Sequence, residues 1–441
     1  MLLNTADLHY PSLNQALRYW FKLGFISFGG PAGQIAMLHQ EMVEKRRWIS
    51  ERRFLHALNY CMLLPGPEAM QLVVYIGWLL HGVWGGLLAG LSFIVPGFLI
   101  LCSLAALYLA WGDVPAVQAV FHGIKPAVVA IVCYAAWRIG QRTLKQAWLW
   151  GIALASFIAL TVFKISFGWI VLAAGSIGLL VYKLKPGLFK HDGHNEAQAA
   201  HTEALIGDDT PSPAYAQFKL KRLLLTLAGF LTLWLVSLGL LLAASPLLSN
   251  MGLFFTKTAF LTIGGAYAVL PYVYHGAVEH YQWLSAVQMM DGLALGETTP
   301  GPLIMIVTWI GYLGGVSQQV AANSLVAGLI GASVTTFYTF LPSFLFIFAG
   351  APLVEATRFT PQFTAPLTAI TAAVVGVIAN LALFFAWHTF WFDSNTQPAH
   401  QIDVFAIVMA ICAFIALWKY QVDVLKVIVV CAFVGLITFW L

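Results

Sequence analysis

The stretches Leu63-Leu64-Pro65-Gly66-Pro67-Glu68 and Thr298-Thr299-Pro300-Gly301-Pro302-Leu303 decide the fold of this chain. Each one interrupts an apolar segment with the same Pro-Gly-Pro tripeptide. Proline has no backbone N–H and fits the first turn of a helix, so each tripeptide predicts that one helix ends and another begins there. Inside a membrane, such a break is tolerated only where it is buried in protein or lines a cavity. We therefore expect two buried helix breaks.

The composition is that of a membrane protein. Of 441 residues, 60% are hydrophobic and 9% are charged, and the mean hydropathy is +0.82. Soluble domains carry about 25% charged residues. Apolar stretches at 83–111, 117–137, 222–249 and 362–392 each reach the roughly 20 residues that cross a bilayer. The fold class is an all-α polytopic membrane protein in a lipid bilayer, which excludes soluble enzymes and nucleic-acid-binding domains.

Several common motifs are absent from the sequence. Residues 1–15 are polar and lack the pattern of a cleavable signal peptide. No Walker A motif occurs, so no built-in ATPase is expected. The cysteines form no Cys-x-x-Cys pair, which argues against a metal site and against a disulfide framework. They are Cys61, Cys102, Cys133, Cys412 and Cys431.

The two Pro-Gly-Pro stretches belong to a longer internal repeat. A shift of 235 positions aligns Trp48 with Trp283, and after an insertion a shift of 246 aligns Pro96 with Pro342. Further pairs are Lys22 with Lys257, Phe25 with Phe260, Gly29-Gly30 with Gly264-Gly265, Glu44 with Glu279, Ser50 with Ser285 and Ile124 with Ile370. So many matches in glycine, proline, tryptophan and charged residues indicate two related halves.

A polar stretch separates the halves. Residues 183–222 include Asp208-Asp209 and Pro211-Ser212-Pro213 and contain few aliphatic side chains, which is typical of a solvated connector. We therefore divide the chain into four parts. They are an N-terminal repeat over 1–183, a polar linker over 184–221, a membrane helix over 222–249 and a C-terminal repeat over 250–441.

Lys and Arg are distributed unevenly between the halves. The loop 41–53 holds five of them, whereas its repeat partner 276–286 holds none. Short cytoplasmic loops carry an excess of Lys and Arg. The first loop is therefore predicted to be cytoplasmic, as is the linker 184–221, and the second loop to face the opposite side. On this interpretation the helix 222–249 reverses the chain, and the two repeats have inverted topology.

The same assignment of sides predicts which segments cross the membrane. Segments that must begin and end on one side are expected to be re-entrant hairpins whose breaks meet near the bilayer midplane. These hairpins are 18–38, 54–81, 252–275 and 287–314. The expected crossings are 83–111, 117–138, 147–163, 166–183, 222–249, 319–349, 362–389, 403–418 and 424–440.

The helix breaks predict a site for a small anion. A break opens a half-helix whose free N–H groups and positive dipole end attract negative charge. Inverted-repeat carriers place substrate between such helices. Paired glycines mark a second break in each half, although tight helix packing is an alternative interpretation of these glycines. The candidate substrate-binding positions are Gly29, Gly30, Pro31, Pro65, Gly66, Pro67, Gly264, Gly265, Pro300, Gly301 and Pro302.

Two lysines occupy matching places in the apolar segments. Lys22 and Lys257 each lie seven residues before a glycine pair. Ionisable residues within membrane segments are costly and are functional candidates by default. We predict that both lysines bind substrate. The alternative is that their side chains extend to the membrane surface.

Carboxylates accompany the two Pro-Gly-Pro stretches. Glu68 follows the first, and Glu297 and Asp291 precede the second. A carboxylate beside an anion site repels the substrate when ionised, so these residues are candidates for coupling transport to protonation. The alternative for Glu68 is a cap on its own helix. His122 and Lys125 have no counterpart in the second half and remain unassigned.

Several motifs in both halves form a specific set. They are Phe28-Gly29-Gly30-Pro31-Ala32-Gly33-Gln34, His39-Gln40-Glu41-Met42-Val43-Glu44, Trp48-Ile49-Ser50, Leu64-Pro65-Gly66-Pro67-Glu68-Ala69, Gly264-Gly265-Ala266-Tyr267 and Thr299-Pro300-Gly301-Pro302. With this set the chain resembles the chromate ion transporters, in their long two-domain form. The resemblance covers roughly residues 18–140 and 250–390.

The resemblance implies a secondary active transporter that exports chromate across the inner membrane and confers chromate resistance. The implied driving force is the proton-motive force, and sulfate is the natural competitor because it is a tetrahedral dianion of similar size. The expected partners are this inorganic oxyanion and the lipid bilayer, with no cofactor and no metal. A homodimer is left open.

Other functions are weighed against chromate export. A carrier for a different small anion, such as sulfate, fits the same site, and broken helices also line the pores of anion channels. An intramembrane enzyme would need a catalytic cluster, yet the sequence has no Gly-x-Ser-x-Gly or His-Glu-x-x-His motif. We therefore predict that the protein is not an enzyme.

Overall fold

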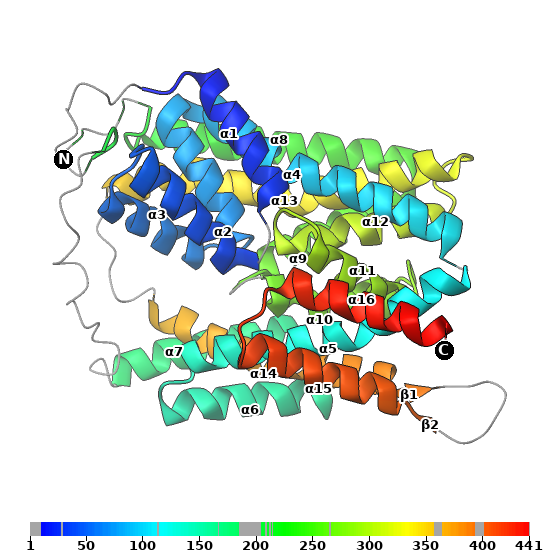
Figure 1. The fold of residues 1–441 in the computed structure, drawn as a ribbon. Helices are drawn as coiled ribbons and strands as arrows, with labels where there is room; N and C mark the ends of the chain where they lie inside the picture. The colour runs from blue at the N-terminus through cyan, green and yellow to red at the C-terminus, as the bar shows by residue number, and fades with distance from the viewer. Residues whose placement is uncertain are drawn as a thin grey trace.

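The structure is a computed structural model, and its architecture is helical apart from one short β-hairpin (Figure 1). This confirms the predicted all-α membrane fold. The structure describes residues 10–27, 30–112, 114–165, 167–184, 204–207, 210, 213, 215–263, 266–356, 364–392 and 401–440.

The first half contains short broken helices followed by long ones. Its elements are α1 (Leu13–Ile26), α2 (Gly30–His39), the π-helical turn η2 (Gln40–Lys45), α3 (Glu51–Leu63), α4 (Glu68–Trp111), α5 (Pro115–Thr143), α6 (Ala147–Thr161) and α7 (Phe167–Leu184). Helix α8 (Leu220–Ala244) follows the linker, at the place of the helix expected over 222–249.

The second half repeats this order. Its elements are α9 (Pro246–Leu261), α10 (Ala266–Tyr274), the π-helical turn η4 (His275–His280), α11 (Ala286–Thr298), the 3₁₀ turn η5 (Leu303–Met305), α12 (Ile306–Ser317), α13 (Ser324–Ala356), α14 (Thr364–Phe390), β1 (Trp391–Phe392), β2 (Gln401–Ile402), α15 (Val404–Trp418) and α16 (Val424–Trp440).

The element bounds follow the sequence repeat closely. Both ends of η4 and of α11 lie 235 residues after those of η2 and α3, and both ends of α15 lie 257 residues after those of α6. The first shift becomes 246 between α12 and α13, where a loop replaces a break inside α4. That break is at His81 and Gly82, whose φ values are −134° and +65°. Glycine adopts the positive φ without a Cβ clash, so α4 is two helices that meet where the predicted hairpin 54–81 ends.

The matched tryptophans and serines hold the corresponding loops in the same shape. Trp48 and Trp283 are both buried, and their backbone N–H groups donate to carbonyls at the same relative position, Met42 and Ala277. Ser50 and Ser285 then cap α3 and α11. A serine cap stabilises a helix by about 1 kcal/mol. The repeated residues thus end one hairpin arm and begin the next.

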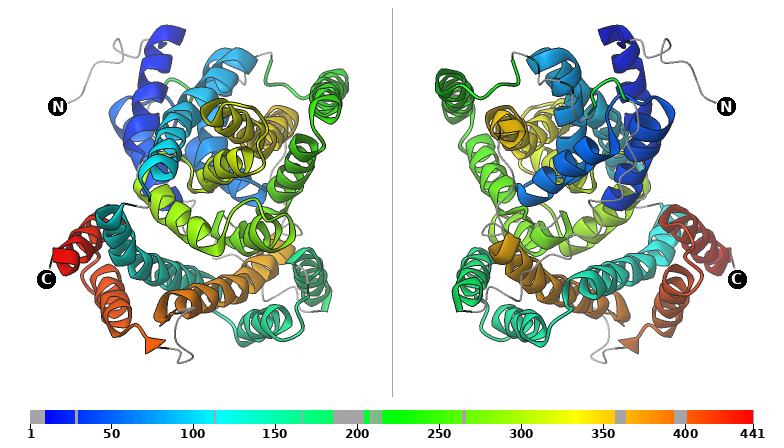
Figure 2. Two further views of the ribbon diagram at one scale, coloured as in Figure 1. Left: turned by 90° about the vertical axis from the view of Figure 1, so that its right-hand side faces the viewer. Right: turned by 90° about the vertical axis from the view of Figure 1, so that its left-hand side faces the viewer.

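The helices of the two halves interleave. Helix α4 packs against α12 and α13, α5 packs against α14, α15 and α16, and α14 packs against α6 and α7. Figure 2 shows the result as two groups of helices, one built around α1–α4, α8, α12 and α13 and the other around α5–α7 and α14–α16. Helix α11 contacts α5, α12 and α16, so it joins the two groups.

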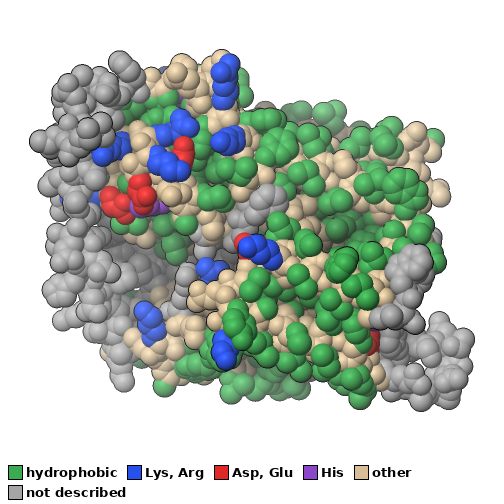
Figure 3. Space-filling view, viewed as in Figure 1, with side chains coloured by type: hydrophobic (Ala, Val, Ile, Leu, Met, Phe, Trp, Pro, Cys, Tyr) green, Lys and Arg blue, Asp and Glu red, His purple; other side chains and the backbone are tan. Residues whose placement is uncertain are grey.

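The outer surface suits a bilayer. Among the residues that the structure describes, six helices are long and apolar enough to cross a membrane, namely α4, α5, α7, α8, α13 and α14, and α6, α12, α15 and α16 are shorter apolar helices. Apolar side chains cover much of the face seen in Figure 3. Helix α8 exposes leucines along its whole length, among them Leu224, Leu231 and Leu240. Exposed leucine is stable in lipid, so the surface supports a multi-pass membrane protein.

Part of the linker is docked on the first half, which the interpretation as a solvated connector missed. The N–H groups of Leu205 and Ile206 donate to the carbonyls of Arg47 and Trp48 at 2.8 and 3.0 Å, and the Ser50 N–H donates to the Ile206 carbonyl at 3.0 Å. Ile206 is buried. Most of the remaining linker lies outside the described residues.

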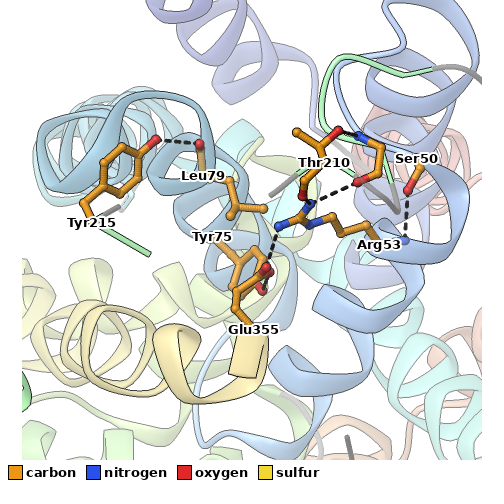
Figure 4. A network of polar contacts seen from close by, with 8 residues as sticks. Ser50, Arg53, Tyr75, Leu79, Thr210, Tyr215 and Glu355 are labelled. Atoms are coloured by element: carbon orange, nitrogen blue, oxygen red, sulfur yellow. Dashed lines mark hydrogen bonds and ion pairs between the residues drawn. The ribbon is translucent and has the colours of Figure 1, made fainter. Parts of the chain in front are cut away.

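The docked linker is fixed to both halves through one arginine (Figure 4). Arg53 donates to the carbonyls of Gly207 and Thr210 at 3.0 and 3.1 Å, and it forms an ion pair with Glu355 at the end of α13, at 2.5 Å. The side chains of this pair are only 9% and 7% exposed. The Tyr75 hydroxyl also donates to Glu355. The first half, the second half and the linker therefore meet at this point.

Candidate functional site

The structure breaks the helix at both Pro-Gly-Pro stretches. Helix α3 ends at Leu63 and α4 begins at Glu68, and in the second half α11 ends at Thr298 before η5 and α12. Gly66 and Gly301 have φ values of +123° and +107°, a region that other residues rarely adopt. The tripeptide therefore forms the same strained turn twice, and glycine is required at its centre.

Each turn is bound to the opposite half of the chain. The Gly66 N–H donates to the Thr262 carbonyl at 2.7 Å, and the Gly301 N–H donates to the Ser27 carbonyl at 3.1 Å. Ser27 and Thr262 occupy equivalent places directly after α1 and α9. The two hydrogen bonds are thus reciprocal, as expected when two similar units meet around a two-fold axis.

The packing around the turns is reciprocal as well. An added Cβ at Gly66 would lie 2.5 Å from the Ser343 Oγ on α13, and one at Gly97 on α4 would lie 2.6 Å from the Pro300 carbonyl. Gly97 and Ser343 are repeat-equivalent. Each Pro-Gly-Pro turn is therefore pressed against the long helix of the other half.

Two buried glutamines reinforce the turns, and the sequence analysis did not single them out. The Gln34 side chain donates to the carbonyls of Ser27 and Gly301 at 3.0 and 2.6 Å. The Gln71 side chain donates to the Pro65 carbonyl at 2.7 Å. Their repeat positions are Val269 and Ile306, so the glutamines distinguish the halves. A polar amide within an apolar segment was the available signal.

The turns leave helix N–H groups free rather than their own. Prolines have no N–H, and those of Gly66 and Gly301 already bind carbonyls. In α4 the first intrahelical donor in this region is Gln71, to Pro67. The N–H groups of the first helical turn have no intrahelical acceptor. The predicted proline and glycine positions therefore shape the turn, whereas the residues that follow, beginning at Glu68 and Leu303, offer donors to an anion.

The glycine pairs are only partly within the described residues. Gly29, Gly264 and Gly265 lie outside them. Gly30 begins α2 with a φ of +69°, and Pro31 follows in the first helical turn. Helix α2 is therefore a second half-helix whose N-terminus lies a few residues from Ser27, which binds the Gly301 turn. The predicted role of the glycine pairs in binding substrate stays a prediction.

The structure separates the coupling candidates. Glu68 is half-buried at the start of α4, directly after the first turn. Glu297 is half-buried in the last turn of α11, and it accepts a hydrogen bond from the Tyr267 hydroxyl at 2.6 Å. Asp291 is buried and binds Tyr108 and Lys125 beside a cavity of about 950 Å³. Glu68 and Glu297 thus flank the turns, and Asp291 belongs to a different place.

The two lysines are not beside the turns. Lys22 and Lys257 are exposed on α1 and α9. Lys22 lines a cavity of about 350 Å³ together with Arg18, Lys45, Arg46 and Glu41, and Figure 3 shows Lys and Arg gathered over this part of the molecule. Their role in substrate binding stays a prediction. Among the described residues, no cluster of His, Cys, Asp and Glu could hold a metal ion.

Comparisons with known proteins match both halves of the chain. A family model described as chromate transporter matches residues 14–179 and 249–436. The chain belongs to the chromate transporter family. The matched regions contain α1–α6 with most of α7, and α9–α15 with most of α16. They leave out the linker and α8, so what the family shares is the pair of repeats.

Curated chromate transporter relatives cover nearly the whole chain. A probable chromate transport protein of Synechococcus elongatus is 30% identical over 434 residues, covering 97% of this chain and 96% of the relative. A chromate transport protein of Pseudomonas aeruginosa is 32% identical, covering 98% and 93%. That of Cupriavidus metallidurans is 31% identical, covering 85% and 83%. No solved structure matches this chain. The chain is therefore a transporter of this family and not an enzyme.

Proposed function

We propose that this protein exports chromate across the inner membrane by secondary active transport, with the substrate bound between the two Pro-Gly-Pro turns. The observation that carries the proposal is the reciprocal binding of each turn to the opposite half. It brings the N-termini of two half-helices together within a chain of the chromate transporter family. Helix N-termini stabilise anions. Sulfate, as a tetrahedral dianion of similar size, is the expected competitor.

We infer that the two halves are inverted and that loop 41–53 and the linker face the cytoplasm. The reciprocal contacts support a two-fold relation between the halves, and the Lys and Arg content of the loops supports opposite orientations. One additional helix, α8, connects the repeats and reverses the chain. An axis in the membrane plane then relates the two substrate-binding turns.

A matched pair of cysteines tests this inversion. Glu44 and Glu279 are repeat-equivalent, and their side chains are 59% and 52% exposed. In intact cells lacking the exposed Cys412 thiol, we expect an impermeant thiol reagent to label Glu279→Cys and not Glu44→Cys. After the cells are opened, both should react. Equal labelling in intact cells would contradict the inverted topology.

The structure supports a state that is open on one side. The large cavity includes Leu109 and Gln288. The repeat-equivalent positions on the other side are Glu355 and Arg53, which form the buried ion pair beneath the linker. An alternating-access carrier closes one side while the other is open. We infer an outward-open state whose cytoplasmic side is closed by Arg53, Glu355 and the linker.

Glu68 is proposed to couple transport to protons. An ionised carboxylate directly after the turn repels a dianion, so wild-type affinity should rise as the pH falls and Glu68 becomes protonated. We expect Glu68→Gln to flatten this pH dependence. Labelled chromate binding to purified protein across the pH range measures it, and Glu44→Gln is the exposed control. An unchanged profile in Glu68→Gln would remove this residue from coupling.

Direct transport distinguishes the proposal from a channel or a carrier for another anion. Proteoliposomes preloaded with unlabelled chromate should take up labelled chromate by exchange, and excess sulfate should slow the uptake. Exchange with sulfate but not chromate would indicate another anion carrier. Conduction at channel rates in voltage-clamped membranes would contradict a carrier mechanism.

A further inference from the structure

The largest cavity lies apart from the Pro-Gly-Pro turns, and both halves form it. It has a volume of about 950 Å³ and is bordered by the end of α4, the first part of α5, the start of α11 and the ends of α15 and α16. Asp291 lies nine residues before Pro300, which corresponds to about 13 Å at the helical rise. The cavity is therefore close to the second turn but separate from it.

Two cationic side chains reach this cavity from one face of α5. His122 and Lys125 are three residues apart, a spacing that places side chains next to each other on a helix. Their side chains are 40% and 25% exposed. The equivalent positions in the second half are Thr368 and Thr371, so this basic pair belongs to one side of the protein only.

Each of these side chains is bound by a carboxylate from the second half. The Lys125 Nζ lies 3.6 Å from the Asp291 Oδ1, and the His122 Nε2 lies 2.8 Å from the Asp403 Oδ2. Tyr108 donates to the other oxygen of Asp291 at 2.9 Å. The other oxygen of Asp403 caps α15 by accepting from the Ala406 N–H at 2.9 Å. Both carboxylates are thus held in place independently of the cations.

The lysine pair is the less complete of the two. A separation of 3.6 Å exceeds the usual length of a charged hydrogen bond. Among the described residues the buried Asp291 Oδ1 has no hydrogen-bond partner. An ammonium group has three donors, so Lys125 retains capacity for a further acceptor in the cavity.

We propose that this cavity is an exit site for the tetrahedral oxyanion, where substrate displaces Asp291 and Asp403 from Lys125 and His122. The inference rests on the proposed function and deepens it. Two cations three residues apart match the spread charge of a dianion. The fixed carboxylates compete with the substrate for the same cations, so the oxyanion binds weakly and leaves, as an exit site requires.

A local probe tests this site without involving the central one. Gln118 is exposed and lines the cavity. In full-length protein carrying Gln118→Cys and Cys412→Ser, sulfate and molybdate should protect the new thiol from an alkylating reagent, while chloride at equal ionic strength should not. These two dianions are suitable because they do not oxidise thiols.

Variants with opposite expected effects decide the assignment. Lys125→Gln should raise the half-protecting sulfate concentration at least tenfold, and Lys125→Arg should restore protection. Asp291→Asn should lower that concentration severalfold because it removes a competitor, a gain that misfolding cannot produce. Lys164→Gln, an exposed lysine outside the cavity, should have no effect.

The outcomes separate this site from the proposed function. Chromate exchange is measured on the same proteins. Exchange without any protection of the Gln118→Cys thiol, or protection unaffected by Lys125→Gln, would overturn the exit site and leave the transporter intact. Protection that follows the expected order in a protein that exchanges no chromate would support the site and contradict chromate transport.

Discussion

Replacing Gly66 with alanine is expected to reduce chromate transport by about 100-fold. The Gly66 φ of +123° is strained for alanine, and strain of this kind costs of order 1–3 kcal/mol. The new Cβ would also lie 2.5 Å from Ser343 Oγ and 2.6 Å from Gln71 Nε2. The turn must shift, which breaks its hydrogen bond to Thr262. Since each 1.4 kcal/mol is tenfold in rate, the combined effect approaches 100-fold.

Two further glycines make this prediction specific. Gly301 has a φ of +107°, but no atom lies closer than 3.8 Å to its added Cβ, so Gly301→Ala should show the strain alone and a smaller loss. Gly239 on α8 has a helical backbone and open space around it. Gly239→Ala should transport normally at equal expression. Wild-type transport by Gly66→Ala would contradict the proposed role of the turns.

Arg53→Ala is expected to destabilise the protein by about 3–5 kcal/mol, because it leaves Glu355 buried without its cation. It also removes the donors that hold Gly207 and Thr210 of the linker. The midpoint of thermal unfolding in detergent measures this loss. Arg53→Ala is also expected to expose the linker, which limited proteolysis detects.

The control for Arg53 is an exposed ion pair on the same side of the protein. Lys45 lies 3.3 Å from Glu41, and its side chain is 58% exposed. Exposed pairs contribute about 0–1 kcal/mol, so Lys45→Ala should unfold near the wild-type midpoint. A second variant, Arg53→Met with Glu355→Leu, should recover stability because it removes both buried charges. Equal midpoints for Arg53→Ala and Lys45→Ala would contradict this account of the ion pair.

The sequence predicted the features that depend on local chemistry. Pro-Gly-Pro breaks a helix wherever it occurs, and hydropathy and the internal repeat do not require knowledge of contacts. The matched residues also marked loops of the same shape, because Trp48 and Ser50 act within their own hairpin. For these reasons the helical membrane fold and the positions of the helix breaks were predictable.

The missed features depend on contacts between distant parts of the chain. Arg53 and Glu355 are 302 residues apart, and Gln34 binds a carbonyl 267 residues away. No pattern along the chain indicates which polar residues will meet. The linker looked solvated because its composition is polar, yet Ile206 adds a bridge beside Ile49. Lys22 and Lys257 matched each other in the repeat, but the rotation of their helices directs both side chains outward.

The most direct test of chromate export is uptake of labelled chromate into inverted membrane vesicles that contain this protein. Cytoplasmic surfaces face outward in such vesicles, so an exporter accumulates its substrate inside. The proposed function predicts accumulation that depends on an imposed proton gradient, falls with excess sulfate and is lost in Gly66→Ala. Uptake no greater than in vesicles without the protein would contradict chromate export.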